Sequence, residues 1–361
     1  MRKTIGLFGA YWIRNYGDDL MALIFAKAFS EAGFEVCAYG MKGYEGAFGL
    51  RTTNSIAQLV EQSHYIVLGG GGFMVPRPVK PGPGYHRQMD IASKELAILA
   101  KERNIPFYAL SVGGSGKGVH AHQIPPGWQF LLKSAKAITV RNEADIPLAR
   151  EFCSNVFHFP DVVWLAPSIS RQTLTPYKKE NAVILQRATI ELRDFRSLLR
   201  WIHRTPKFKI REWNLRREVS RLGFRATHVE PLIKEGRNGN LTDNMLDILD
   251  KLRSCRAIVS PTLHLGVSSL SFGNAFLSWH GNEKTRTFMS EVGIETFCGP
   301  DPRAVAEKLK SLEHNSTKLL LNRDQITEFQ SGAQEHIKVF LEMINSDAYS
   351  SNKKLNGVQS D

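Results

Sequence analysis

Residues 257–279 read AIVSPTLHLGVSSLSFGNAFLSW, and this segment indicates the fold of the whole chain. Its apolar start, residues 257–259, predicts a strand, residues 264–272 have helical spacing, and a second apolar run closes the segment. A strand, a loop, a helix and a second strand in this order are typical of a parallel sheet. Ligands bind beyond the carboxyl ends of the strands in such sheets, so the loop with Thr262 and His264 is predicted to face a site.

Short apolar runs alternate with helical segments over most of the chain. Strands are predicted at residues 4–10, 34–39, 65–68, 106–112, 137–140, 182–186 and 225–229. Residues 167–181 are polar and show neither apolar period, which is typical of an interdomain linker. The predicted fold class is therefore α/β, with two Rossmann-like domains in a GT-B-like arrangement and an interdomain cleft.

The domain bounds follow from this linker and from the last helical pattern. An N-terminal Rossmann-like domain is predicted over residues 1–170, and a C-terminal one over residues 181–322. A closing helix is expected over residues 323–345, and the polar tail at 346–361 is expected to be disordered.

The chain is basic, with 47 Lys+Arg against 35 Asp+Glu and a formal net charge of +12. Such an excess favours anionic partners, such as phosphorylated metabolites, acidic glycans or an anionic membrane surface. The basic residues are scattered, and we find neither an aromatic-rich RNA-binding motif nor a basic recognition helix, so nucleic acid is not an expected partner.

The chain has four cysteines, and they lie far apart with no C-x-x-C motif and no histidine at metal-binding spacing. This pattern predicts buried thiols in a reducing cytosol, and no metal site. No run approaches the roughly 20 apolar residues that a membrane-spanning helix needs, so any membrane contact is expected to be peripheral.

Glycines follow two predicted strands of the first domain. Because glycine has no Cβ, its backbone amide can approach an anion closely, although a tight turn without a ligand is the alternative interpretation. Both clusters are expected at the same edge of one sheet. They provide five candidate binding residues: Gly70, Gly71, Gly72, Ser111 and Gly113.

Charged and polar residues also follow predicted strands. Asp18, in the loop that also holds Asn15 and Gly17, could bind a substrate hydroxyl or cap the next helix. Arg187 follows the strand at 182–186, where it could clamp a carboxylate or phosphate or be an ordinary surface arginine. The remaining candidates at strand ends are Arg141, Asp161, Ser260 and Lys284.

His264 is the strongest single candidate. A histidine side chain gains and loses a proton near neutral pH, which suits a general acid or base. A buried core histidine is the alternative, but the position directly after a strand end favours a functional role.

In their order and spacing, these pieces resemble the polysaccharide pyruvyl transferase family. The matching segments are Asn15–Asp19, Val67–Phe73, Ser111–Gly113, Ile138–Glu143, Pro160–Asp161, Arg187, Leu263–His264 and Gly281–Lys284. The family resembles GT-B enzymes and transfers pyruvate from phosphoenolpyruvate to two hydroxyls of a sugar, forming a cyclic ketal. The resemblance thus implies phosphoenolpyruvate as co-substrate, with no cofactor and no metal.

The resemblance also implies roles for the candidates. His264 and Asp18 become the catalytic residues, and the donor side comprises Arg187, Lys284, Thr262 and Ser260. The acceptor side comprises Asn15, Gly17, the glycine clusters of the first domain and Arg141. The family usually shows Arg-Leu-His where this chain has Thr262-Leu263-His264, so one arginine expected near the donor is absent.

The implied acceptor is a sugar of an exopolysaccharide or cell-surface glycan precursor, in the cytoplasm. A lipid-linked acceptor would give the basic surface a reason to contact the inner face of a membrane. Two other classes stay open: a GT-B nucleotide-sugar glycosyltransferase, which would release a nucleoside diphosphate, and a non-catalytic glycan-binding protein, which would turn over neither donor.

Overall fold

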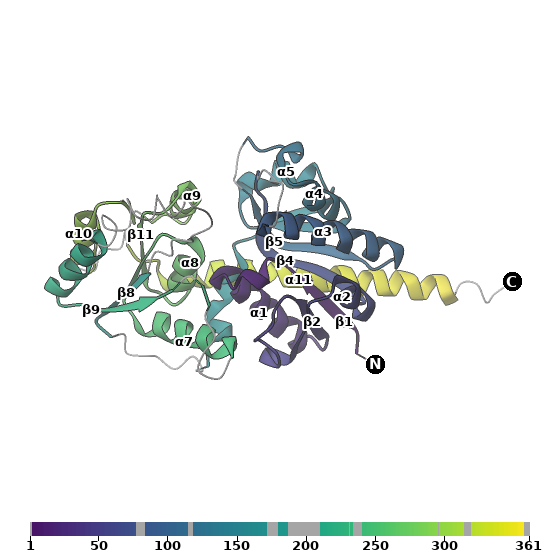
Figure 1. Ribbon diagram of the computed structural model, residues 1–361, viewed down its shortest axis with the longest axis horizontal. Coiled ribbons are helices and arrows are strands. Elements are labelled where there is room, and N and C mark those ends of the chain that lie inside the picture. The colour runs from purple at the N-terminus through teal and green to yellow at the C-terminus, as the bar shows by residue number, and fades with distance from the viewer. Residues whose placement is uncertain are drawn as a thin grey trace. The chain divides into compact units, whose positions relative to one another are not determined.

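The computed structural model describes residues 2–76, 84–114, 118–171, 180–186, 210–230, 232–233, 240–294, 296–313 and 319–356 (Figure 1). The chain divides into two compact units. Unit 1 comprises Met1–Tyr11, Met21–Val162 and Phe329–Asp361, and unit 2 comprises Trp12–Leu20 and Val163–Glu328. Each unit therefore takes its chain from separate parts of the sequence.

The described part of unit 1 contains a seven-stranded parallel sheet in the order β3-β2-β1-β4-β5-β6-β7. Its strands are β1 (Thr4–Phe8), β2 (Glu35–Tyr39), β3 (Leu50–Thr53), β4 (Tyr65–Met74), β5 (Phe107–Gly114), β6 (Ala135–Val140) and β7 (Val156–His158). The helices are α1 (Tyr16–Glu31), α2 (Ile56–Gln62), α3 (Tyr85–Glu102), α4 (Pro126–Lys133), α5 (Ile146–Arg150) and α11 (Arg323–Asn356). The division between the units falls inside both α1 and α11.

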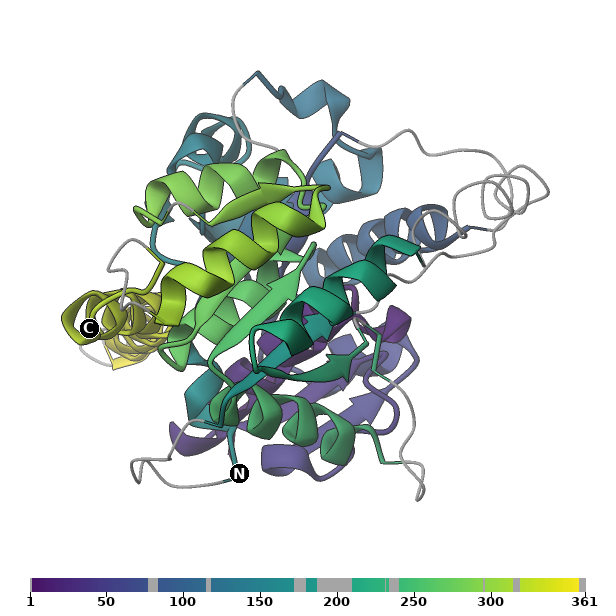
Figure 2. The same cartoon turned by 90° about the vertical axis from the view of Figure 1, so that its left-hand side faces the viewer.

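The described part of unit 2 contains a five-stranded parallel sheet in the order β12-β11-β10-β8-β9. Its strands are β8 (Ala182–Gln186), β9 (Arg225–Val229), β10 (Ala257–Ser260), β11 (Ala275–Trp279) and β12 (Phe297–Gly299). Helices lie on both faces of this sheet (Figure 2): a helix over residues 210–221, α7 (Leu241–Ser254), α8 (Leu263–Ser271), α9 (Glu283–Glu291) and α10 (Pro302–Glu313).

Local sequence explains why these elements form. In α7, the Asn240 side chain caps the helix by accepting a hydrogen bond of 2.8 Å from the Thr242 amide. Apolar residues then recur at helical spacing and are buried: Leu241, Met245, Ile248, Leu249 and Leu252. The segment at residues 257–279 forms β10, α8 and β11, which confirms the strand-loop-helix-strand prediction.

Single-turn 3₁₀ segments join several elements, at Tyr11–Ile13, Ala47–Gly49, Ala121–Gln123 and Glu143–Asp145, and a longer one lies at Val162–Ile169. All four cysteines are buried and none forms a disulfide, as the prediction of buried thiols requires. Burial raises the pKa of the Cys298 thiol to about 11.

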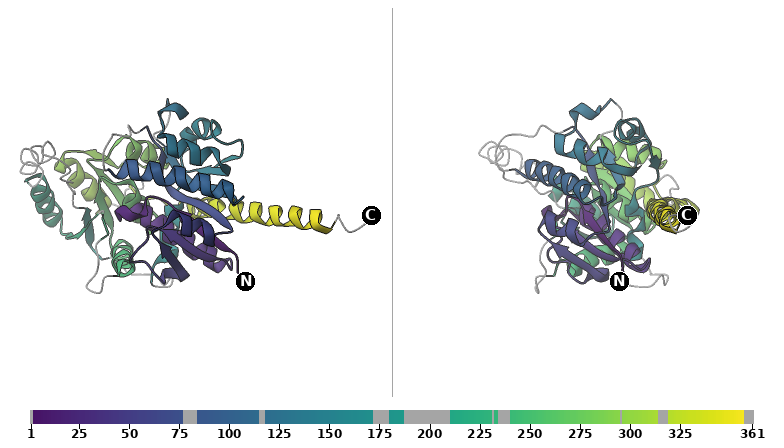
Figure 3. Two further views of the ribbon diagram at one scale, coloured as in Figure 1. Left: turned by 45° about the vertical axis from the view of Figure 1, so that its right-hand side comes forward. Right: turned by 90° about the vertical axis from the view of Figure 1, so that its right-hand side faces the viewer.

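The bounds differ from the expected ones at three places. The segment Trp12–Leu20 belongs to unit 2, although it lies within the predicted first domain. The second break falls at Val162/Val163, before the predicted linker, of which residues 172–179 lie outside the described residues. Helix α11 continues past residue 345 to Asn356 (Figure 3), because neither proline nor glycine interrupts residues 345–356. Residues 357–361 lie outside the described residues.

Candidate functional site

The candidate site lies at the carboxyl edge of the sheet of unit 2. His264 is the second residue of α8, which begins directly after β10, and its side chain is half-buried. The imidazole of His264 is therefore not fully buried in the core, and it lies at the start of a short helix. Among the five strands, β10 is central, with β11 on one side and β8 on the other.

The first turn of α1 packs against His264, within unit 2. A Cβ atom built on Gly17 would lie 1.8 Å from His264 Nδ1, so only glycine fits beside this ring. Asn15 Oδ1 accepts a hydrogen bond of 2.9 Å from the Gly17 amide, which fixes the start of the helix. The family resemblance implied an acceptor role for Gly17. In the structure Gly17 contacts the ring of His264, and the acceptor role stays a prediction.

The backbone of His264 is fixed by the same turn of α1. The Tyr16 hydroxyl donates a hydrogen bond of 2.9 Å to Ser268 Oγ, and Ser268 Oγ donates one of 2.8 Å to the carbonyl of His264. Burial raises the pKa of the Tyr16 phenol, so this hydroxyl keeps its proton and stays a donor. Sequence analysis assigned no role to Tyr16 or Ser268, because a contact between positions 252 residues apart leaves no local pattern.

The same N-terminal segment also pairs with the chain that follows β9. Asn15 forms an antiparallel bridge with Leu232, and the amide of Ile233 donates a hydrogen bond of 2.8 Å to the Arg14 carbonyl. Because β8 lies between β10 and β9, residues 14–17 cross the carboxyl end of β8. Arg187, which directly follows β8, lies outside the described residues.

Ser260 and Thr262 form a hydrogen-bonded group with Gln186, which sequence analysis did not single out. The Thr262 hydroxyl donates a hydrogen bond of 2.7 Å to Gln186 Oε1, and the Ser260 hydroxyl donates to the same oxygen. The Thr262 amide donates to Ser260 Oγ at 2.9 Å. This group holds the loop before α8, and the Thr262 side chain makes no capping hydrogen bond to that helix.

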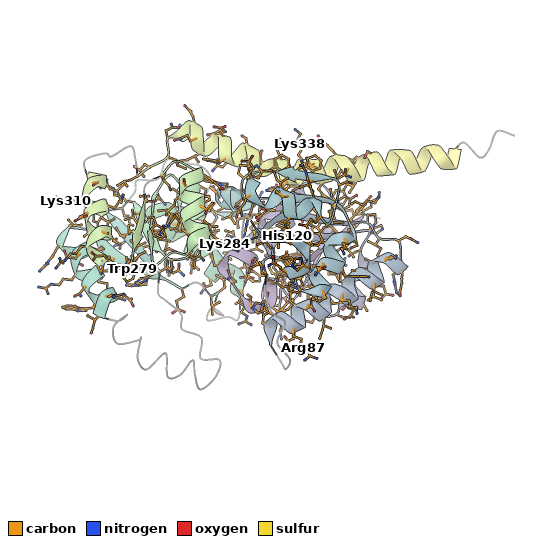
Figure 4. All side chains as sticks on the ribbon, turned by 90° about the horizontal axis from the view of Figure 1, so that it is seen from above. Arg87, His120, Trp279, Lys284, Lys310 and Lys338 are labelled. Carbon is orange, nitrogen blue, oxygen red and sulfur yellow. The ribbon has the colours of Figure 1, made fainter. Side chains whose placement is uncertain are left out.

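Asp18 and Lys284 both lie in the first turns of helices at this edge. Helix α1 begins at Tyr16, so Asp18 lies inside its first turn and not at the capping position that the sequence suggested. A carboxylate there stabilises the positive end of the helix. Lys284 follows β11 in the first turn of α9 and is half-buried (Figure 4).

The glycine cluster of unit 1 lies inside a strand, so the prediction of a loop after a short strand is wrong. Strand β4 runs from Tyr65 to Met74, and Gly69, Gly70 and Gly71 are buried within it. A Cβ on Gly69 would lie 2.5 Å from the Tyr11 hydroxyl, and one on Gly70 would lie 2.4 Å from Met21 Sδ. The missing Cβ thus serves close packing here, and only Gly72 is half-exposed.

Ser111, Gly113 and Arg141 are buried together in unit 1. Ser111 and Gly113 lie within β5, and Ser111 has a left-handed φ of 53°. A Cβ on Gly113 would lie 2.5 Å from Arg141 Nε. The guanidinium of Arg141 pairs with Asp161 at 3.0 Å, and the two side chains are 7% and 5% exposed. Little of the Arg141 side chain is accessible to a ligand, and its acceptor role stays a prediction.

His336 of α11 completes this buried network, and nothing in the sequence indicated it. Its Nε2–H donates to the Pro160 carbonyl at 2.9 Å, because a carbonyl can only accept. Its Nδ1 therefore accepts from the Thr139 hydroxyl at 2.6 Å. Thr139 Oγ1 in turn accepts from the Ser111 amide at 2.9 Å. The hydrogen bonds join β5, β6 and α11 across 197 positions of sequence.

We expect the stability of the protein to fall between pH 6.5 and pH 4 through His336. Burial lowers the pKa of this imidazole to about 4, so the unfolded chain binds its proton first as the pH falls. Relative to the ordinary value of about 6.5, this corresponds to roughly 3 kcal/mol of unfolding free energy, present above pH 6.5 and lost by pH 4. Urea unfolding at pH 7, 6, 5 and 4 measures this change in the free energy of unfolding.

The variant His336→Gln is the control, because glutamine can donate and accept at similar positions but does not titrate. It is expected to unfold more easily at pH 7 and to show a shallower dependence on pH than the unchanged protein. Equal pH dependences for the two proteins would contradict the assignment.

Within the part of the chain that the structure describes, no group of three or more His, Cys, Asp and Glu side chains could hold a metal ion. The helices of those same residues include none that is long and apolar enough to cross a bilayer.

Comparison with known proteins gives a family match. The protein-family model described as polysaccharide pyruvyl transferase matches residues 15–277. This range includes the first turn of α1, His264, the strands β8 to β10 and the first three residues of β11. No curated protein matches the chain significantly.

Solved structures match over nearly the whole chain. UDP-GlcNAc 2-epimerase from Neisseria meningitidis has a TM-score of 0.54 and 11% identity, and the match covers 94% of this chain and 100% of that one. For S. aureus MnaA the TM-score is 0.52 and the identity 12%, with 96% and 98% covered. For UDP-GlcNAc 2-epimerase from Methanocaldococcus jannaschii they are 0.52 and 12%, with 94% and 99% covered. At these identities the likeness shows the fold, and it confirms the predicted α/β class of GT-B type.

Proposed function

The chain belongs to the polysaccharide pyruvyl transferase family, and from this we propose that it transfers pyruvate from phosphoenolpyruvate to a sugar as a cyclic ketal. The proposed acceptor is a sugar of an exopolysaccharide or cell-surface glycan precursor. One observation supports it most: His264 is half-buried at the carboxyl edge of the sheet of unit 2, held by the first turn of α1.

The proposed reaction has two additions to one carbon. His264 protonates the methylene carbon of phosphoenolpyruvate, which becomes a methyl group, and a sugar hydroxyl attacks the adjacent cationic carbon. The neutral imidazole then accepts the proton of that hydroxyl. The C–O bond that joins this carbon to the phosphate then breaks, and phosphate leaves with the bridging oxygen. A second hydroxyl of the sugar attacks the same carbon, and the proton of that hydroxyl goes to the phosphate. A positioned histidine contributes about a hundredfold or more to such proton transfers.

The donor carries a carboxylate and a phosphate, so the site needs positive charge. The amino end of α8 provides a partial positive charge beside His264, and Thr262 does not cap it with its side chain. Lys284 adds a full positive charge on the β11 side of β10. Arg187 is proposed to bind the donor because it directly follows β8 in the sequence. Ser260 and Thr262 hold the loop that precedes α8.

The acceptor would approach from the first turn of α1. Asp18 lies in the same unit as His264, and its carboxylate can accept a hydrogen bond from a sugar hydroxyl. We propose that Asp18 orients the attacking hydroxyl, with Asn15 beside it. A lipid-linked acceptor would bring the basic chain to an anionic membrane surface.

The experiment is an assay of the purified protein with phosphoenolpyruvate and a panel of galactosides, glucosides and mannosides. We expect release of inorganic phosphate that depends on the acceptor, and one product with the mass of a pyruvyl ketal. Release of a nucleoside diphosphate from a nucleotide sugar would instead support a glycosyltransferase. Binding of an oligosaccharide without turnover of either donor would support a glycan-binding protein.

A further inference from the structure

Arg14 lies at the carboxyl edge of the sheet of unit 2, although the sequence places it near the amino terminus of the chain. Its carbonyl accepts a hydrogen bond from the amide of Ile233, after β9. Three residues later, Gly17 contacts the ring of His264, after β10. Strand β8 lies between those two strands, so Arg14 is placed beside the edge where ligands bind in parallel sheets.

The backbone of Arg14 is in an unusual conformation for a residue with a side chain. Its φ is 57°, in the left-handed region, which costs of the order of 1 kcal/mol or more and is enriched at binding and active sites. The surrounding hydrogen bonds hold this conformation, because Asn15 pairs with Leu232 directly after it. A glycine would adopt this backbone without strain, and the chain has an arginine there.

The strand order places positive charge on both sides of His264. Lys284 follows β11, on one side of β10, and Arg14 lies by β8 and β9 on the other side. A guanidinium binds carboxylate and phosphate through paired hydrogen bonds, which an ammonium group cannot do. Arg14 and Lys284 are both half-buried, so each side chain is partly accessible to a ligand at this edge of the sheet.

We propose that Arg14 binds an anionic group of the donor, on the side of His264 opposite to Lys284. This inference rests on the proposed function, because it takes phosphoenolpyruvate as the donor. It assigns to the N-terminal segment a donor-binding role in addition to its contact with His264.

The test is the variant Arg14→Gly, which removes the guanidinium and keeps the left-handed backbone accessible. We expect its KM for phosphoenolpyruvate to rise about tenfold or more, with a smaller change in kcat and an unchanged KM for the acceptor. Arg14→Lys, which keeps the charge but loses the paired hydrogen bonds, should give an intermediate KM. Steady-state phosphate release over a range of phosphoenolpyruvate concentrations measures all of these.

Asn104→Gly is the matched control, because Asn104 also has a left-handed φ, of 53°, and lies in unit 1. Its KM values should equal those of the unchanged protein. An unchanged KM for phosphoenolpyruvate in Arg14→Gly, or a loss of thermal stability and kcat without a change in KM, would overturn the inference. Failure of the unchanged protein to turn over phosphoenolpyruvate would instead refute the proposed function, so the two failures are distinguishable.

Discussion

The variant His264→Ala is expected to lose about a hundredfold or more of the rate of pyruvyl transfer and to remain folded. The imidazole is the group that we propose moves protons at the donor carbon, and alanine cannot replace it. Because the ring is only half-buried, its removal should cost the fold little. The measurement is kcat for phosphate release at saturating phosphoenolpyruvate and acceptor, with circular dichroism of both proteins.

His120→Ala is the control for this variant. His120 is an exposed histidine of unit 1, 3.5 Å from Glu151, and its side chain is 64% exposed (Figure 4). Its removal should leave kcat unchanged. A folded His264→Ala protein with nearly normal turnover would reject the proton-transfer role.

Gly17→Ala is expected to reduce activity by a comparable factor, without removing any group that takes part in the chemistry. The new methyl group would lie 1.8 Å from His264 Nδ1 and 2.7 Å from its Cβ, so rotation of the ring alone cannot relieve the clash. The start of α1 or of α8 must move, and a displacement of this size misaligns the imidazole from its substrate. Overpacking of this kind also costs about 1–3 kcal/mol of unfolding free energy.

Gly84→Ala provides the matched control, because a Cβ there would meet no atom within 4 Å and no positive φ is required. The double variant Gly17→Ala with His264→Ala should regain part of the lost stability, since most of the clashing ring is gone. Kinetics and urea unfolding of the four proteins in this cycle measure the coupling of the two positions. Additive losses of stability would show that the contact is absent.

Local patterns predicted much of the fold. The apolar runs and helical spacing at residues 257–279 became β10, α8 and β11, because each run is buried within its own element. The position of His264 after a strand followed from the same pattern. Periodicity reports which face of an element is buried, and the parallel sheet follows from the alternation of elements.

The contacts made over long distances in the sequence were not predicted. The prediction assigned Asn15 and Gly17 to the first domain by their sequence position, whereas the structure groups them with His264. The ring of His336 reaches Thr139 from a helix near the other end of the chain. Neither contact leaves a local signal, because each depends on how distant segments pair.

The glycines of β4 show a different limit. Glycine is required where a Cβ atom would overlap a neighbouring atom. The sequence alone does not show whether that neighbour belongs to a ligand or to the protein. For Gly69 and Gly70 the neighbours are Tyr11, Phe25 and Met21, so the protein itself requires them. The structure shows that β4 continues beyond residue 68 and that its glycines at 69–71 are buried, and the sequence did not predict this.

The discontinuous chain path of the units has a consequence for biosynthesis. The ribosome makes residues 12–20 long before Ser268 and His264, their partners in unit 2. Likewise, Thr139 and Pro160 can form their hydrogen bonds with His336 only after that residue has been made. Domains made of continuous chain can fold one after another as they emerge. Here unit 2 has all its segments only when Glu328 has been made, and unit 1 only when the rest of α11 has been translated. A nascent chain stalled before α11 would therefore display an unfinished unit 1, and expression of residues 163–328 alone would yield unit 2 without the turn that holds its histidine.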